Sequence, residues 1–264
     1  MSGGAGVTTI AVLGLGEAGS AIAGDAAAAG ARVRGCDPVR AAPAGVELAR
    51  DATSAATGAD VVVSVNSAAV ALEVVETVAP VLEPGRLFAD LNTAAPALKR
   101  AAAAIVEGRG AAFADVALLR GVPDWGIHTP SLASGTGAEE FAQVFGRLGM
   151  AVTQVGAAAG DAAAHKLARS VIMKGLAAAV GEALAAGERL GFEDWLRRDI
   201  EATLTAADAG MLHRLVEGSR VHAVRRVEEM AAAISMLEEL GVEPRSAAAS
   251  EAWLRSLTAS EVPG

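Results

Sequence analysis

Residues 9–19, Thr-Ile-Ala-Val-Leu-Gly-Leu-Gly-Glu-Ala-Gly, join a short apolar segment to an alanine-rich one. The spacing of the three glycines is one in which the first allows a tight turn, the second lets the backbone approach a pyrophosphate, and the third packs helix against strand. A helix that begins here offers unpaired N–H groups and a partial positive charge to phosphate oxygens. Because the glycines lie between a strand and a helix, the pattern predicts a dinucleotide-binding turn. The expected contacts are Gly14, Leu15, Gly16, Glu17, Ala18 and Gly19.

Strand-like and helix-like segments alternate from Val7 to about Val155. This alternation is typical of βαβ units around a mostly parallel sheet. Strands are expected at Thr8–Leu13, Arg32–Cys36, Asp60–Val65, Leu87–Asp90, Ala112–Val116, Ser131–Ser134 and Val152–Val155. Helices are expected at Ala18–Ala29, Ala68–Val81, Ala95–Glu107 and Ala138–Leu148. The expected fold class is therefore α/β, a Rossmann-type doubly wound sheet followed by an all-helical domain.

After Gly160 the alternation stops, and nearly everything to Leu257 has a helical pattern interrupted by glycine turns. The first of these helices, Asp161–Leu190, would extend roughly 45 Å at about 1.5 Å per residue, long enough to cross between domains or reach a partner subunit. The sequence predicts a Rossmann dinucleotide-binding domain over residues 1–158 and an all-helical substrate and dimerisation domain over residues 159–264.

The composition excludes several classes of function. Acidic residues outnumber basic ones by 31 to 22, and no Lys/Arg stripe follows one face, so no nucleic-acid partner is expected. The single cysteine, Cys36, cannot form an internal disulfide, and no Cys/His set has metal-ligand spacing, so we expect a cytoplasmic, metal-free protein. Residues 1–6 lack the regions of a signal peptide, and charges interrupt the alanine-rich runs, so no membrane segment is expected.

Asp37 follows the second expected strand, where a carboxylate can accept hydrogen bonds from ribose hydroxyls. This favours NAD over NADP, because the carboxylate would repel a 2′-phosphate. Arg40, three residues later, leaves NADP open, because a guanidinium can pair with that phosphate or stack on adenine. Asp37 could instead only begin an Asp-Pro turn. Val65 and Asn66, at the end of the third expected strand, are further candidate cofactor contacts.

Lys166, Ser170 and Lys174 are spaced four residues apart on the long helix and so share one face. Two lysines and a hydroxyl beside a cofactor domain can serve a carbonyl or an alcohol. A lysine must have its pKa lowered by burial or a cationic neighbour before it accepts a proton near neutrality, and Lys174 would act in that direction on Lys166. Spacing alone favours a solvated basic face, because exposed lysines are common on helices.

The sequence here resembles the β-hydroxyacid dehydrogenases related to 6-phosphogluconate dehydrogenase. The glycine turn matches the N-terminal signature of that family, and residues 88–93, Phe-Ala-Asp-Leu-Asn-Thr, with Pro96 are similar to its Asp-x-Ser-Thr segment near the nicotinamide. Residues 156–170 are similar to the segment that carries the catalytic lysine. The resemblance implies that Lys166 exchanges a proton with the substrate oxygen while hydride moves to or from the nicotinamide, with Asn92 and Thr93 beside it.

Two departures from the family pattern concern the substrate. The asparagine four residues after the family lysine is Ser170 here, which offers a hydroxyl in place of an amide. The family segment Asp-x-Pro-Val-Ser-Gly-Gly is replaced by residues 115–123, Asp-Val-Ala-Leu-Leu-Arg-Gly-Val-Pro. Leu119 makes this part more apolar, and Arg120 can pair with a carboxylate or simply lie on a surface loop. The substrate cannot be carried over from the family.

The segment from His222 to Met230 is expected to be helical, with His222, Arg225, Arg226 and Glu229 on nearly one face. Its sequence resembles the C-terminal domain of a poorly characterised subgroup of the family. Because a partner subunit completes the active site in related enzymes, the resemblance implies a homodimer in which His222 and Arg226 bind a substrate anion. The alternative is a salt-bridged surface with an Arg225–Glu229 pair.

The residues and the resemblance together predict an NAD(P)-dependent oxidoreductase that acts on a small 3-hydroxy acid or a related polar alcohol. The general acid/base is Lys166, assisted by Ser170 and Lys174. The substrate contacts are expected to be Asn92, Leu119, Arg120, Lys166, Ser170, Lys174, His222 and Arg226. An imine reductase on the same scaffold is a second possibility, although a lysine at this position argues against it. A third is a non-catalytic dinucleotide-sensing protein that uses its helical domain to bind a partner.

Overall fold

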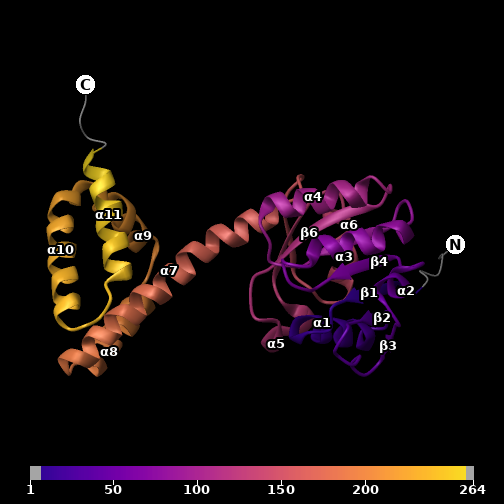
Figure 1. Cartoon of the computed structure of the whole chain (residues 1–264), viewed down its shortest axis with the longest axis horizontal. Coiled ribbons are helices and arrows are strands. Elements are labelled where there is room, and N and C mark those ends of the chain that lie inside the picture. Colours follow the sequence, from indigo (N-terminus) through magenta and orange to yellow (C-terminus); the bar gives the residue numbers. More distant parts are fainter. Residues whose placement is uncertain (1–6, 260–264) are drawn as a thin grey trace. The chain divides into compact units, whose positions relative to one another are not determined.

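A computed structural model describes residues 7–259 of the chain. The chain divides into two compact units, Met1–Arg169 and Ser170–Gly264 (Figure 1). The predicted boundary after residue 158 falls between the last strand and the first long helix. The division between the compact units falls later, after Arg169, because the first turns of that helix pack with the strands. The residues 1–6 on which the expectation of no signal peptide rests lie outside the described part.

The first unit is built on one eight-stranded sheet with the strand order β3-β2-β1-β4-β5-β6-β7-β8. All neighbouring strands are parallel except β6 and β7. The chain direction across the sheet reverses between β1 and β4, and ligands of such folds bind outside the carboxyl ends of the strands at this point. The strands are β1 (Thr9–Leu13), β2 (Arg32–Cys36), β3 (Val46–Leu48), β4 (Val61–Ser64), β5 (Leu87–Asp90), β6 (Ala112–Leu118), β7 (Ser131–Ser134) and β8 (Val152–Gly156).

Helices cover both faces of the sheet, and each face has its own core. Alternate residues of β1 serve the two cores, with Ile10 and Val12 in one and Ala11 and Leu13 in the other. Because both faces are covered, every residue of β4 is buried. The helical segments of this unit are α1 (Glu17–Ala28), α2 (Ala52–Ala56), α3 (Ala71–Val78), η1 (Ala79–Val81), α4 (Pro96–Glu107), α5 (Val122–Trp125), η2 (Gly126–His128) and α6 (Ala138–Arg147).

The sequence-based assignment misses four short elements, β3, α2, α5 and η2. Strand β3 has three residues at the edge of the sheet, and α2 is held by Asp51, whose side chain accepts a hydrogen bond from the Ser54 N–H. All four are too short for a periodicity to be recognised. The second predicted helix begins late, at Ala71 instead of Ala68. The predicted strands and the remaining predicted helices of this unit are confirmed to within about three residues at each end.

The second unit is helical throughout its described part. Its helices are α7 (Asp161–Leu190), which begins in the first unit, α8 (Glu193–Thr205), α9 (Ala209–Val221), α10 (Ala223–Glu239) and α11 (Arg245–Ala259). Glu182 of α7 accepts hydrogen bonds from the N–H groups of Ser246 and Ala247 and so caps the first turn of α11. The core cluster of this unit contains three buried residues, Ala186, Leu237 and Ala247, and α8 buries none.

By length and composition, α7 is the one described helix that passes a test for a membrane span, with a window of mean hydropathy 1.3. The expectation that charges interrupt every alanine-rich run too soon is therefore wrong for this helix. Its hydropathy comes mostly from valine, isoleucine, leucine and methionine residues, and the stretch still contains Lys174 and Glu182. Core helices of soluble proteins pass the same test.

Candidate active site

The glycine turn between β1 and α1 leaves no room for side chains at two of its three glycines. Gly14 has φ +103°, and a Cβ there would lie 2.2 Å from the carbonyl oxygen of Val65. A Cβ on Gly19 would lie 1.9 Å from the carbonyl oxygen of Gly14. A Cβ on Gly16, in contrast, would meet nothing within 4 Å. The turn is thus packed on its inner side and open at Gly16, as the approach of a pyrophosphate requires.

The beginning of α1 fits a phosphate group. Among the described residues no side chain caps this helix at Gly16, so its first N–H groups and its partial positive charge remain available. A hollow of about 380 Å³ lies beside the turn, lined by Leu15, Gly16, Glu17, Ser20, Arg40 and Ala41. Glu17 brings a negative charge and Arg40 a positive one to its wall. The residues present therefore fit a dinucleotide, with Arg40 able to contact its adenosine end.

Asp37 lies at the end of β2, as predicted, and its carboxylate is held by the protein backbone. One oxygen accepts a hydrogen bond from the Leu15 N–H at 2.8 Å, and the other accepts from the N–H groups of Val39 and Arg40 at 2.9 Å. Burial acts to raise the pKa of Asp37, but the three hydrogen bonds and the Arg40 charge outweigh it and lower the pKa. The group is therefore a fixed negative charge that also ties the glycine turn to the loop after β2.

A polar network joins the ends of β4 and β5. The amide nitrogen of Asn92 donates to Asp90 Oδ1 at 2.6 Å and to Ser64 Oγ at 3.0 Å, and its oxygen accepts from the Asn66 N–H. Asn66 in turn donates to Ser64 Oγ at 3.0 Å. Asn92 is buried, and its amide nitrogen and oxygen already make hydrogen bonds within the protein. We therefore do not propose that Asn92 contacts the substrate. Val65 immediately precedes Asn66, and its carbonyl oxygen packs against Gly14.

Lys166 and Thr93 meet at this same edge of the sheet. The Lys166 Nζ donates a hydrogen bond to Thr93 Oγ1 at 2.8 Å, although the two residues are 73 positions apart in sequence. Thr93 follows β5, and Lys166 lies on the second turn of α7. The structure thus brings the predicted lysine to the segment that resembles the nicotinamide-proximal signature.

A second lysine of this unit, Lys99, was not identified as a candidate site residue from the sequence. Lys99 is fully buried, with its Nζ 3.2 Å from Asp90 Oδ2 and 3.2 Å from Asp115 Oδ1. The chain contains only three lysines among its 22 basic residues. Because most basic residues of this chain are arginines, each of its few lysines is a candidate for a specific role.

The loop after β6 carries Arg120, a cation expected to face a substrate, and α7 carries a second cation that was not expected. Arg169, one turn after Lys166, donates a hydrogen bond to the carbonyl oxygen of Leu119 at 3.2 Å. The guanidinium of Arg120 lies 4.9 Å from the centre of the Trp125 ring. Among the described residues, no carboxylate lies within 4.0 Å of either arginine. Arg169 could have been found in the sequence, because three residues separate it from Lys166 on a helix.

A comparison with known families decides the identity of the first unit. Residues 9–156 match the NAD binding domain of 6-phosphogluconate dehydrogenase, more than half of the chain. The chain belongs to this family. The match confirms the Rossmann-type fold and the NAD(P)-binding role predicted for the first domain. Residues 188–257 match DUF1932, a domain of unknown function.

Solved structures with the fold of this family cover nearly the whole chain. A conserved hypothetical protein from Sinorhizobium meliloti is 31% identical, over 94% of this chain and 88% of that one, with a TM-score of 0.63. A conserved protein of unknown function, described as similar to 3-hydroxyacid dehydrogenases, is 25% identical over 97% and 100%, with a TM-score of 0.62. The imine reductase from Myxococcus stipitatus, in complex with NADP+, is 23% identical over 96% and 95%, with a TM-score of 0.81, and at this identity shows the fold alone.

The remaining predicted site residues lie in the second unit. Ser170 and Lys174 follow Lys166 on α7. His222 lies in the break between α9 and α10, so the expected continuous helix through it is wrong. Its backbone ends one helix and begins the next. Arg226 donates to Ser219 Oγ at 2.5 Å, and the predicted Arg225–Glu229 pair is confirmed at 3.6 Å.

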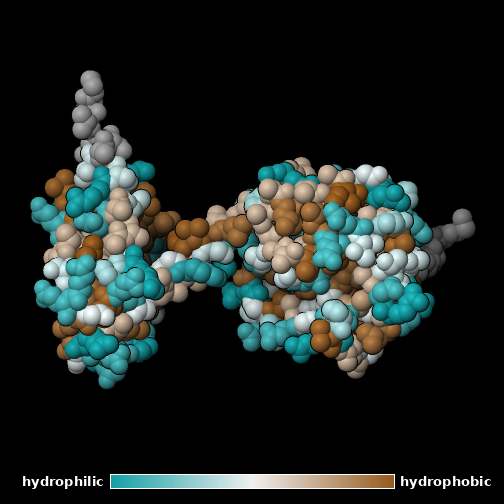
Figure 2. All heavy atoms as spheres, viewed as in Figure 1, coloured by the Kyte–Doolittle hydropathy of each residue, from teal (hydrophilic) through white to brown (hydrophobic). Residues whose placement is uncertain are grey.

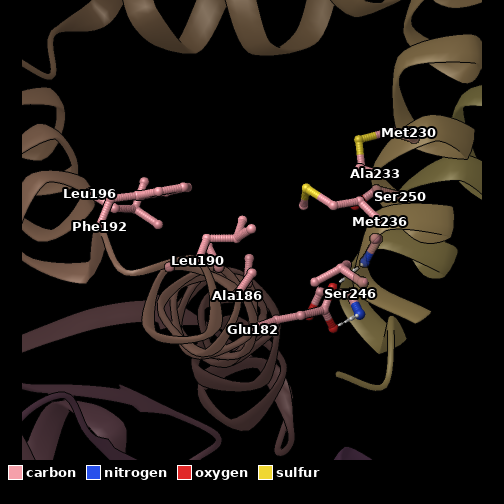
Figure 3. A pocket seen from close by; sticks show the side chains of 15 residues that line it. Glu182, Ala186, Leu190, Phe192, Leu196, Met230, Ala233, Met236, Ser246 and Ser250 are labelled. Atoms are coloured by element: carbon pink, nitrogen blue, oxygen red, sulfur yellow. Dashed lines mark hydrogen bonds between the residues drawn. The ribbon is translucent and has the colours of Figure 1, made fainter. Parts of the chain in front are cut away.

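Another hollow, in the second unit, is apolar and contains none of the predicted site residues. It has a volume of about 360 Å³ between α7, α8, α10 and α11, with Leu190, Phe192 and Met236 among the side chains that point into it (Figure 3). Its one charged residue is Glu182, whose carboxylate already caps α11. Such a lining suits apolar side chains and offers no chemistry for hydride transfer.

Proposed function

We propose that the chain is an NAD(P)-dependent dehydrogenase of small 3-hydroxy acids, with Lys166 as the general acid/base. The observation that carries this proposal is the hydrogen bond from Lys166 to Thr93 at the carboxyl edge of the sheet, on the edge that also carries the glycine turn. The bound nicotinamide would supply the hydride acceptor. Lys166 would take the hydroxyl proton as hydride leaves the carbinol carbon, and Thr93 would orient its amine.

The preference for an acid is supported by Arg120 and Arg169. Arg120 is next to Leu119 in the sequence, and Arg169, one helical turn from Lys166, donates a hydrogen bond to the Leu119 carbonyl oxygen. A guanidinium pairs well with a carboxylate through two parallel hydrogen bonds. A substrate whose carboxylate is held there would present its hydroxyl carbon toward the lysine.

Lys166→Ala tests the proposal directly. Turnover should fall by about 100-fold or more, the usual contribution of a positioned acid/base group, while the Kd for the dinucleotide stays within about twofold. Arg189→Ala, on the last turn of the same helix, is the control and should leave both unchanged. The measurement is nicotinamide absorbance across a panel of hydroxy acids. Undiminished turnover in the Lys166 variant would remove this residue from the mechanism.

Reduction of imines is the second candidate, favoured by the solved imine reductases that share this fold. The two candidates differ in the bond that accepts hydride, so cyclic imines and 3-oxo acids should be offered side by side to the protein with NADH or NADPH. A dehydrogenase should reduce the oxo acids, and the Lys166→Ala change should abolish that reaction. Dinucleotide binding without turnover of either class would instead indicate a sensing protein.

We infer a preference for NAD from the fixed charge of Asp37 beside the adenosine end of the hollow. Glu17 adds a second negative charge, and Arg40 alone opposes them. A 2′-phosphate would therefore meet more repulsion than attraction. The ratio of the Kd values for NADPH and NADH in the unmodified protein measures this preference, and a ratio below one would contradict it.

We propose further that two copies of the chain associate. The core cluster of the second unit contains three buried residues, few for an independent helical unit of its length. On α7, Val171 and Ile172 are 76% and 64% exposed, and apolar atoms lie at the surface along this helix (Figure 2). Burying such side chains against a second copy is the arrangement that the thin core favours.

A further inference from the structure

The fully buried charges of this protein form one cluster of Lys99, Asp90 and Asp115, each with no exposed side-chain surface. They come from three elements, α4, β5 and β6. Lys99 Nζ lies 3.2 Å from an oxygen of each carboxylate and donates a hydrogen bond to the Asp90 carbonyl oxygen at 2.8 Å. Because this group is sealed from solvent, Lys99 cannot itself touch a substrate.

One arm of the cluster leads to Thr93. Asp90 Oδ1 accepts hydrogen bonds from the backbone N–H of Asn92 at 3.0 Å and from its amide nitrogen at 2.6 Å. Together with the bond from Lys99 to the Asp90 carbonyl, these contacts fix the turn that ends β5. Thr93 is the next residue, so the position of its hydroxyl depends on the same carboxylate.

The other arm leads to Lys166. Asp115 Oδ2 accepts hydrogen bonds from the N–H groups of Gly160 at 3.1 Å and Ala163 at 2.9 Å. It thereby caps α7 from a different element and compensates the partial positive charge at the beginning of that helix. Lys166 lies three residues after Ala163, on the same side of the helix.

Two further contacts make this second arm rigid. Ser134 donates to the same Asp115 oxygen at 3.2 Å and accepts from the Ala162 N–H at 3.0 Å. A Cβ on Gly160 would lie 2.9 Å from the Pro96 carbonyl oxygen, so the beginnings of α7 and α4 are in direct contact. Lys99 lies on the first turn of α4 and contacts the carboxylates of Asp90 and Asp115, from which the two arms begin.

We propose that Lys99 is a positioning residue that fixes the distance between Lys166 and Thr93. It is the one cation within 4.0 Å of Asp90 and Asp115 among the described residues. Without it two buried carboxylates would face each other without compensation, and each would move toward water or take up a proton. Either response would disturb the hydrogen bonds that hold the turn before Thr93 or those that hold the beginning of α7. The Lys166–Thr93 contact depends on both sets of bonds. The inference rests on the proposed function only in assigning chemistry to Lys166.

The three lysines of the chain make this testable without a substrate. Labelling the whole protein with lysine carrying ¹³C at the ε position gives three side-chain signals, assigned by replacing each lysine in turn. The unmodified protein should show an ordered Lys166 signal with two inequivalent ε-protons. In Lys99→Met this signal should collapse to the averaged shift of a mobile side chain. Arg100→Met, the next residue along α4 and exposed, is the matched control and should leave it unchanged.

A folded Lys99→Met protein whose Lys166 signal is unchanged would overturn the proposal. If that variant does not fold, Asp115→Asn decides, because the amide keeps the volume and one acceptor oxygen but loses the charge that faces Lys99. The same collapse, in milder form, is expected there, and its absence would also overturn the inference. Where turnover is measurable, kcat should fall at least tenfold in either variant, with the Kd for the dinucleotide unchanged. Altered signals in a protein without hydride transfer would refute the proposed function alone.

Discussion

The two units of this chain bury their apolar residues to very different extents. The first unit has two extensive cores, one on each face of the sheet, whereas the second has three buried residues in its core cluster. Large side chains of the second unit remain exposed, among them Trp195 at 57%, Leu212 at 59% and Val224 at 67%. The first unit thus has extensive cores of its own, whereas the second leaves large apolar side chains exposed, which we propose a second copy of the chain covers.

The largest expected effect comes from adding one methyl group to the glycine turn of the first unit. Gly14→Ala forces an alanine into φ +103° and onto the Val65 carbonyl. Strain of this kind costs about 1–3 kcal/mol before the overlap is counted, so we expect dinucleotide affinity to fall by about 100-fold or more. Fluorescence titration with NADH measures it.

Gly181→Ala is the matched change in the second unit. Gly181 lies within α7, where a Cβ would meet nothing within 4 Å. Alanine is favoured over glycine inside a helix by about 0.5–1 kcal/mol, so this variant should be slightly more stable and bind the dinucleotide normally. Equal losses in both variants would show that the glycine turn is not the special one.

A pair of leucines compares the two cores. Leu87→Ala in β5 should destabilise the first unit by about 4 kcal/mol, and Leu237→Ala in α10 the second by about 2 kcal/mol, within the usual range for buried leucine. The difference is expected because Leu87 is enclosed on all sides and Leu237 borders the open hollow. Denaturant unfolding followed by circular dichroism would measure both. A larger loss at Leu237 would mean that the second unit is as well packed as the first.

An exposed isoleucine tests whether a second copy completes the second unit. Ile172→Glu should weaken association by about 2 kcal/mol or more, since burying an isoleucine contributes about 1.5–3 kcal/mol and a buried glutamate is unfavourable. Sedimentation velocity at micromolar concentration should then show a lighter species. Leu48→Glu, at a residue 56% exposed on the edge strand β3, is the control and should leave the mass unchanged. A monomeric unmodified protein would refute the association.

The parts of the molecule that the sequence predicts are those encoded by neighbouring residues. The glycine turn, the strands and the place of Asp37 each follow from a short segment with a recognisable period or spacing. Lys166 was found because a family pattern marks it. Its Thr93 partner was suggested by a separate segment, but their contact spans 73 positions and is visible only in the fold.

The buried cluster could not be predicted in the same way. Lys99 lies in an alanine-rich helix and resembles any solvated lysine, and its two carboxylates end different strands. Only the register of β5 with β6, which pairs Asp90 with Asp115, brings them together. In the second unit, no glycine or proline marks the break between α9 and α10 at His222. The sequence pattern therefore predicted a continuous helix through this residue.

The smallest expected effect concerns acid and the carboxylate that holds the glycine turn. Because the pKa of Asp37 is lowered in the folded protein, its contribution to stability is complete above the ordinary carboxyl pKa of about 3.9 and is lost as the pH falls through its native value. The contribution of Asp37 to the free energy of unfolding should therefore be constant from pH 5 to 8. Since solvent screens a group this exposed, we expect Asp37→Asn to cost only about 0.5 kcal/mol at pH 7.

The same variant should also change cofactor choice, because an amide no longer repels a 2′-phosphate. The ratio of the Kd values for NADPH and NADH should move toward NADPH. Asp208→Asn, which alters an exposed carboxylate that caps α9 in the second unit, should leave that ratio unchanged. If both variants shifted the ratio equally, the cause would be net charge and not the position of Asp37. A shift confined to Asp37 would place cofactor discrimination in the first unit, the part of the chain that has extensive cores of its own.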